Sequence, residues 1–133
     1  MLPVYDVTHT EKFIHPNDTT EPRTEFTIGV IDARAMAWVD KTFTQLLWTK
    51  NAEGKPEPNV QIDTQGKQIE LVKMGVRAVV NFPLPLVIVP ERYPFGTRHV
   101  LDDASINAIT PYIPALAKAI ENMVAVTPAD EKK

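Results

Sequence analysis

The chain has 133 residues, of which 44% are hydrophobic and 23% charged, and its 14 Lys and Arg against 17 Asp and Glu leave a net charge of −3. A chain of about this length folds as one domain with an ordinary hydrophobic core. The sequence has no cysteine, which excludes disulfides, thiolate metal sites and cysteine nucleophiles. The longest apolar run, Phe82–Pro90, is far shorter than the ~20 residues that cross a bilayer. The first residues resemble no secretory signal, so we expect no membrane partner.

Charge is spread unevenly along the chain. Residues 1–32 carry six acids and two bases, a balance of −4, and the remainder nearly cancels. Nucleic-acid binding usually needs a clustered basic face, and acids interrupt every basic stretch here, so we expect no nucleic-acid partner. The opening segment is rich in Thr, Asp, Glu and Pro, which is typical of a solvated arm. We therefore expect residues 1–23 to form an acidic extended arm and residues 24–133 to form a single α+β domain.

The first regular elements are a strand and a helix. From Thr24 to Val30 apolar and polar residues alternate, which predicts a half-buried strand. Asp32 follows as a candidate N-cap. Apolar residues at helical spacing then predict a helix that runs to about Trp48: Met36, Val39, Phe43, Leu46 and Leu47. Residues 51–59 contain Gly and Pro and predict a loop, after which Val60 and Ile62 could form a short extended piece.

The middle of the chain predicts a second helix and a long loop. Apolar residues repeat at three and four from Ile69 to Val80, although Gly75 and the valines lower helix propensity. Four prolines lie between residues 82 and 100. They predict an irregular connection with at most an edge strand through Leu86–Val89.

The last third has clearer helix boundaries. Asp102 or Asp103 can cap a short helix that ends at about Ile109, and Thr110-Pro111 can begin the next helix. One apolar stripe follows in that helix: Ile113, Leu116, Ala117, Ile120 and Val124. The cap-plus-proline pattern returns at residues 127–130 and predicts a short turn. The expected fold is α+β, with an N-terminal strand or hairpin, three to four helices and a long proline-rich loop.

The residues that carry out catalysis are scarce. The single serine, Ser105, has no Gly-x-Ser-x-Gly elbow around it. The histidines do not show the spacing of a zinc-binding helix: His9, His15 and His99. The first two could share a metal with Asp6 or Asp18, although solvated loop histidines are far commoner. Two Gly-Lys pairs lack the rest of a phosphate loop. We therefore expect no catalytic residue, no cofactor, no metal and no enzyme activity.

Aromatic and arginine residues remain as candidate partner contacts. Long loops are often functional, and the loop predicted here carries residue types favoured at interfaces, although its apolar residues could simply cover the core. Aromatic residues on the first predicted helix are explained most simply as core, or they could line a groove for an apolar partner segment. The candidate partner-binding residues are Trp38, Phe43, Arg92, Tyr93, Phe95 and Arg98.

Three segments carry a family resemblance: Thr24–Arg34, Ile69–Phe82, and the ending that runs from Leu116 to Asn122 and from Val126 to Lys133. Together they resemble the small tail assembly chaperones of long-tailed bacteriophages and prophages. The resemblance implies a nonenzymatic factor in the host cytoplasm. That factor would bind the tape measure protein and help the tail tube assemble around it.

A second hypothesis is a structural virion component, such as a head-decoration, connector or tail subunit. Its arm and proline-rich loop would contact neighbouring subunits, and the protein would be retained in the virion. The sequence leaves open which phage protein is the partner and whether copies of the chain associate.

Overall fold

The structure is a computed structural model that describes residues 6–124. Within these residues the chain forms strands in three small antiparallel sheets, four α-helices and one 3-10 turn. In chain order these are β1 (Thr10–Phe13), β2 (Glu25–Gly29), α1 (Ala33–Thr42), β3 (Thr44–Lys50), β4 (Pro56–Ile62), α2 (Thr64–Gly75), β5 (Val76–Val80), β6 (Ile88–Tyr93), β7 (Gly96–Leu101), α3 (Asp103–Ala108), η1 (Thr110–Tyr112) and α4 (Ile113–Val124). The expected single strand or hairpin followed by helices is therefore wrong, because seven strands occur.

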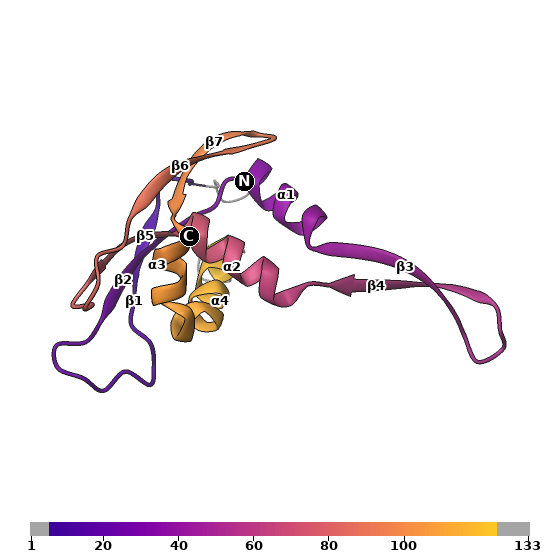
Figure 1. Cartoon of the computed structure of the whole chain (residues 1–133), viewed down its shortest axis with the longest axis horizontal. Helices are drawn as coiled ribbons and strands as arrows, with labels where there is room; N and C mark the ends of the chain where they lie inside the picture. Colours follow the sequence, from indigo (N-terminus) through magenta and orange to yellow (C-terminus); the bar gives the residue numbers. More distant parts are fainter. Residues whose placement is uncertain (1–5, 125–133) are drawn as a thin grey trace, which may run out of the picture.

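The core lies between one sheet and the helices. Strand β2 is the middle strand of the order β1-β2-β5, and its Phe26 and Ile28 are buried. Helix α4 contacts both β2 and α2, and Figure 1 shows α2, α3 and α4 grouped beside the sheet. The side chains of Leu71, Leu116 and Ile120 have no exposed surface. The strand predicted at 24–30 is confirmed, and residues 10–13 of the expected arm form its neighbour β1.

The first helix is shorter than predicted. Asp32 is the N-cap, as expected, and its carboxylate accepts a hydrogen bond from the Ala35 amide at 2.8 Å. The helix ends at Thr42 rather than at Trp48, and residues 44–50 form β3. The apolar residues of this stretch fit a period of two as well as a helical period, and pairing with β4 selects the strand.

Strands β3 and β4 form a hairpin that projects far from the rest of the molecule (Figure 1). At its base the Asp63 amide donates to the Phe43 carbonyl at 2.8 Å, and at its tip the Asn51 amide donates to the Lys55 carbonyl at 3.0 Å. Gly54 adopts φ +77° in the turn, which glycine tolerates best. The loop predicted at 51–59 is thus confined to the tip, and the extended piece at Val60 and Ile62 is confirmed.

The second helix is displaced along the sequence. It begins at Thr64, where Asp63 caps it by accepting from the Gly66 amide at 3.0 Å. It ends at Gly75, and the valine-rich residues 76–80 form β5 on β2. The predicted helix from Ile69 to Val80 is wrong in its second half because β-branched residues fit a strand better.

The prediction of a long irregular loop at residues 82–100 is also wrong in its second half. Strands β6 and β7 pair there as a hairpin, with Pro90 opposite His99. Along β6 the burial alternates, so that Val89 and Tyr93 face inward while Pro90 faces solvent. A two-stranded sheet has only edge strands, which tolerate proline where no ladder hydrogen bond is needed.

The C-terminal helices follow the prediction in part. Asp102 caps α3 by accepting from the Ser105 amide at 2.8 Å, which confirms that prediction. Thr110 does not cap the next helix, because its hydroxyl donates to the carbonyls of Ile106 and Asn107. The stripe of α4 is buried as expected at Ile113, Leu116, Ala117 and Ile120. The turn predicted at 127–130 lies outside the described residues. No helix within 6–124 has the length and apolar character needed to span a membrane.

Gly75, at the end of α2, packs closely against Ile120 of α4. A methyl group at Gly75 would lie 2.5 Å from Cδ1 of Ile120 and 2.9 Å from its Cγ1 and Cγ2. Because Ile120 is fully buried, we expect Gly75→Ala to lower the free energy of unfolding by about 1–3 kcal/mol, as measured by urea denaturation. Ile120→Val removes the nearest atom, so the double variant should lose less than the sum of the two single losses. Additive losses would contradict the contact.

Candidate protein-interaction surfaces

The β3–β4 hairpin is amphipathic. Alternate side chains of a strand share a face, and the register pairs Thr44 with Ile62, Leu46 with Val60, Trp48 with Pro58, and Lys50 with Pro56. These pairs form what we call the arm face. The opposite face carries Gln45, Leu47, Thr49, Glu57, Asn59 and Gln61. The sequence therefore places its apolar side chains on one side of the arm and mostly polar ones on the other.

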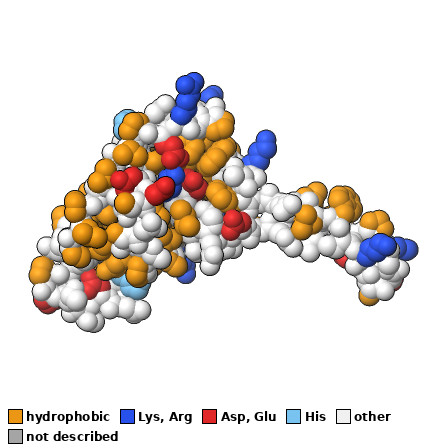
Figure 2. Space-filling view, in the orientation of Figure 1, with side chains coloured by type: hydrophobic (Ala, Val, Ile, Leu, Met, Phe, Trp, Pro, Cys, Tyr) orange, Lys and Arg blue, Asp and Glu red, His pale blue; other side chains and the backbone are white. Residues whose placement is uncertain are grey.

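The arm face is exposed to solvent. Exposed fractions are 57% for Leu46, 67% for Trp48, 61% for Val60 and 56% for Ile62. Figure 2 shows apolar side chains along the projecting arm. Large apolar side chains gathered on one exposed face mark interaction sites in soluble proteins. The sequence interpretation of Trp48 as part of the core is wrong, because the strand carries it away from the domain.

A second exposed apolar surface lies at β5 and the connection from β5 to β6. Four large apolar side chains here are 42–55% exposed: Val80, Leu84, Val87 and Ile88. A groove of about 500 Å³ runs here, lined by residues 77–79, 81–86 and 88. We call this surface the β5 groove. It is an open hollow bordered by an edge strand, since within residues 6–124 strand β5 pairs with β2 alone.

Five of the six predicted partner-binding residues lie together. The Trp38 ring centroid is 5.2 Å from that of Tyr93 and 5.8 Å from that of Phe95. Tyr93 and Phe95 stack at 5.0 Å, Phe43 lies 6.3 Å from Trp38, and the Arg98 guanidinium lies 5.0 Å above Phe95. This aromatic cluster fixes the β6–β7 hairpin against α1, and its members are buried or half-buried.

The sixth residue, Arg92, lies apart from the aromatic cluster. It is exposed on β6, between the inward-facing residues Glu91 and Tyr93. The cluster therefore stabilises the domain from within. Partner binding by any of the six residues stays a prediction.

The Arg98 side chain also forms an ion pair with the helix cap. Its Nε lies 2.8 Å from Oδ2 of Asp32. Partial burial alone would raise the pKa of Asp32, but hydrogen bonds from the Ala35 amide and from Arg98 outweigh it, so the pKa lies below its usual range. The pair joins β7 to the start of α1.

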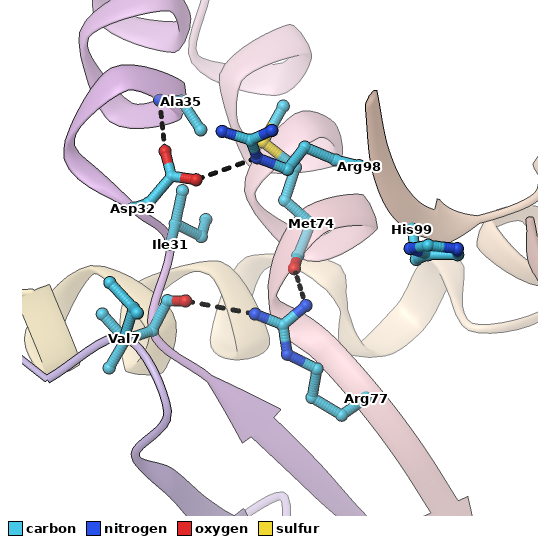
Figure 3. Close-up of a pocket in the computed structure, with 9 residues that line it drawn as sticks. Val7, Ile31, Asp32, Ala35, Met74, Arg77, Arg98 and His99 are labelled. Atoms are coloured by element: carbon cyan, nitrogen blue, oxygen red, sulfur yellow. Dashed lines mark hydrogen bonds and ion pairs between the residues drawn. The ribbon is translucent and has the colours of Figure 1, made fainter. Parts of the chain in front are cut away.

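A pocket of about 290 Å³ lies beside this pair, and Figure 3 shows its lining. The Arg77 guanidinium donates to the carbonyls of Met74 at 2.7 Å and Val30 at 3.1 Å. Burial lowers the pKa of Arg77. The two guanidinium groups of the pocket are thus held in place by acceptors of the chain itself, backbone carbonyls for Arg77 and the Asp32 carboxylate for Arg98.

A second charged group joins α2 to β6. Lys73 Nζ lies 3.0 and 3.1 Å from the two carboxylate oxygens of Glu91 and 3.7 Å from Glu70. Burial raises the pKa of Glu70, whereas the nearby Tyr93 hydroxyl and the Lys73 ammonium lower the pKa of Glu91. Burial and both carboxylates raise the pKa of Tyr93, whose hydroxyl donates to Oε2 of Glu70 at 3.4 Å. Lys73 thus forms ion pairs with a carboxylate of its own helix and with one of β6, which holds β6 against α2.

The histidine and acid residues do not converge on a metal site in the described part of the chain. No group of three or more His, Asp or Glu within residues 6–124 is placed to hold an ion. His9 lies 3.4 Å from Glu11, whereas Nδ1 of His15 accepts a hydrogen bond from the Asn17 amide. Within residues 6–124, the structure therefore does not gather His9 and His15 with Asp6 or Asp18 into one ligand group.

No protein family, curated protein or solved structure matches the chain.

The Asp32–Arg98 pair gives stability a defined pH dependence. Because folding lowers the pKa of Asp32, the unfolded state binds more protons in acid. Stability from this group is therefore present above about pH 4 and is lost as pH falls further. We expect Asp32→Asn to cost about 1 kcal/mol at neutral pH and to flatten the acid limb, as measured by urea unfolding between about pH 3 and 7.

The matched variant is Arg98→Gln, which removes the pair from the other side. In the Asp32→Asn background it should cost less than it does alone. Identical acid limbs for the parent protein and Asp32→Asn would contradict this assignment.

Proposed function

We propose that the protein is a noncatalytic subunit of a macromolecular assembly, which binds neighbouring protein subunits through its β3–β4 hairpin. The observation that carries this proposal is the exposed arm face. Small-molecule sites are concave and enclose their ligands, whereas this arm is convex and projects from the domain. A convex apolar surface fits the surface of another macromolecule.

The shape of the arm supports binding rather than chemistry. An isolated two-stranded hairpin is marginally stable in water, and the side chains of Leu46, Trp48 and Val60 are more than half exposed. Covering them would both stabilise the arm and supply binding free energy, at roughly 25 cal/mol per Å² of apolar area. The hairpin is therefore most stable when a neighbouring subunit covers the arm face.

The biological setting that we propose comes from the resemblance of three sequence segments to phage tail assembly proteins. Within that setting, the arm favours a structural virion component that contacts adjacent subunits and is retained in the particle. Assembly would take place in the host cytoplasm, and the finished protein would reside in the virion.

The tape-measure hypothesis is the second candidate. The β5 groove supports it, because an open hollow of about 500 Å³ whose lining residues are mostly apolar in type could receive side chains from one face of an amphipathic helix. A chaperone of this kind would leave the finished particle, which separates it from the structural role.

The two roles are tested by genetic complementation of the phage or prophage that encodes the chain. The gene is removed, and either the parent protein or the variant Trp48→Gln/Val60→Thr is supplied. The variant keeps residue types compatible with strands and removes apolar surface from the arm face. We expect the yield of infectious particles to fall about tenfold or more, as measured by titre.

The control is Gln45→Thr/Gln61→Thr, which alters a cross-strand pair on the opposite face of the same hairpin and should restore normal yield. Mass spectrometry of purified particles then measures retention. Stoichiometric protein favours the structural role and absence favours the chaperone. Full yield with Trp48→Gln/Val60→Thr would overturn the proposed role of the arm.

A further inference from the structure

We infer that the arm face of one copy binds the β5 groove of a second copy, so that the chain assembles head to tail. This inference rests on the proposed function and names the neighbour. It is drawn from two unpartnered apolar surfaces of opposite shape on one chain: a convex arm and a concave groove. Each is partly exposed to water, and each provides the kind of surface that the other lacks.

The two surfaces cannot meet within one molecule. Figure 1 shows the β3–β4 hairpin extending to one end of the long axis, while the β5–β6 connection lies at the other end. A contact between unlike surfaces on two copies is heterologous, and repetition of it produces a ring when the rotation closes or a filament when it does not. A symmetric dimer would instead use the same patch twice.

The hairpin binds through its face rather than through a strand edge. The Asp63 amide bonds to Phe43 and the Asn51 amide bonds to Lys55 across the hairpin. Odd-numbered residues therefore form the hydrogen-bonded pairs, and the amide positions of even-numbered residues point to the open edges. Pro56 and Pro58 occupy two such positions on β4 and have no N–H to donate, which blunts that edge. The side chains of the arm face remain as the binding surface.

Charge near the β5 groove is close to balanced. Glu25, which is in register with Val80, lies 3.8 Å from Lys12, and Glu21 lies 3.9 Å from Arg23. Lys50 is the only charged residue of the arm face and lies at its tip end. The contact that we infer is therefore made by apolar side chains of complementary shape rather than by ion pairs.

The size of the contact indicates how it becomes stable. Four large side chains at these exposures amount to roughly 400 Å² of apolar surface. A standard interface buries about 800 Å² on each partner, of which a little over half, or about 450 Å², is apolar. One arm in one groove therefore approaches the size of a standard interface only when the whole arm face is covered. In a closed ring each copy donates one arm and receives one, so every copy takes part in two contacts and the closed assembly is favoured.

Sedimentation velocity of the full chain at concentrations up to about 100 μM, where a weak interface is occupied, tests the inference. We expect the parent protein to sediment as a concentration-dependent oligomer. Trp48→Gln/Val60→Thr damages the arm and Leu84→Glu damages the groove, and each should weaken association about tenfold or more. Ile69→Gln, at an exposed apolar position on α2 outside both surfaces, should associate as the parent does.

Mixing the two damaged variants makes the test specific. The Leu84→Glu copy keeps its arm and the Trp48→Gln/Val60→Thr copy keeps its groove, so one intact interface forms between them. The mixture should yield a one-to-one dimer that does not grow, which also shows that both variants are folded. A hairpin-to-hairpin dimer would instead survive Leu84→Glu and would not be restored by mixing; either result overturns the inference.

A monomeric parent protein at every concentration would also overturn it. The same holds if a helical tape measure segment binds the groove of a parent protein that does not self-associate, because another occupant is then established. Neither result removes the proposed function, since retention in particles and loss of yield with the arm variant are measured separately.

Discussion

A two-stranded hairpin has a single layer, and this constraint governs how the protein can work. Within residues 6–124 no second layer covers the arm face, and Leu46, Trp48 and Val60 are more than half exposed. The arm is nonetheless held firmly at its base. The Asp63 amide bonds to the Phe43 carbonyl at 2.8 Å, and Lys67 on α2 lies 3.1 Å from Asp40 on α1. Helices α1 and α2 thus hold the base of a hairpin whose apolar face the other residues of 6–124 leave exposed.

The remainder of the molecule acts as the platform for that arm. Helix α2 contacts α1, α3, α4 and β7, and Lys73 ties it to Glu91 on β6. The β6–β7 hairpin is also fixed to α1, by Trp38 against Tyr93 and Phe95 and by the pair between Arg98 and Asp32. Because these aromatic and charged groups satisfy one another inside the domain, the exposed apolar surfaces are left as the candidates for partner contact.

Local signals in the sequence predicted part of this fold, and non-local pairing determined the rest. The caps at Asp32 and Asp102 were predictable because a carboxylate bonds to an amide three residues away. The β3 strand was not, because Phe43, Leu46 and Leu47 fit a helical spacing, and only the partner strand β4 favours the alternative. The candidate partner contacts show the same contrast. Five of the six predicted residues lie together in the aromatic cluster, whereas the exposure of Trp48 was not predictable because it depends on the pairing of β3 with β4.

The arm also has features that limit indiscriminate association, which is the risk of any exposed apolar strand. Pro56 and Pro58 remove two donors from the open edge of β4, and Lys50 places a charge at the end of the arm face. An unrelated protein that pairs with strand edges gains little binding free energy from this arm. A protein surface complementary to the side chains of the arm face can instead bury all of its exposed apolar area. Specificity then depends on complementary shape. A chain that carries both an arm and a groove can supply that shape from its own sequence.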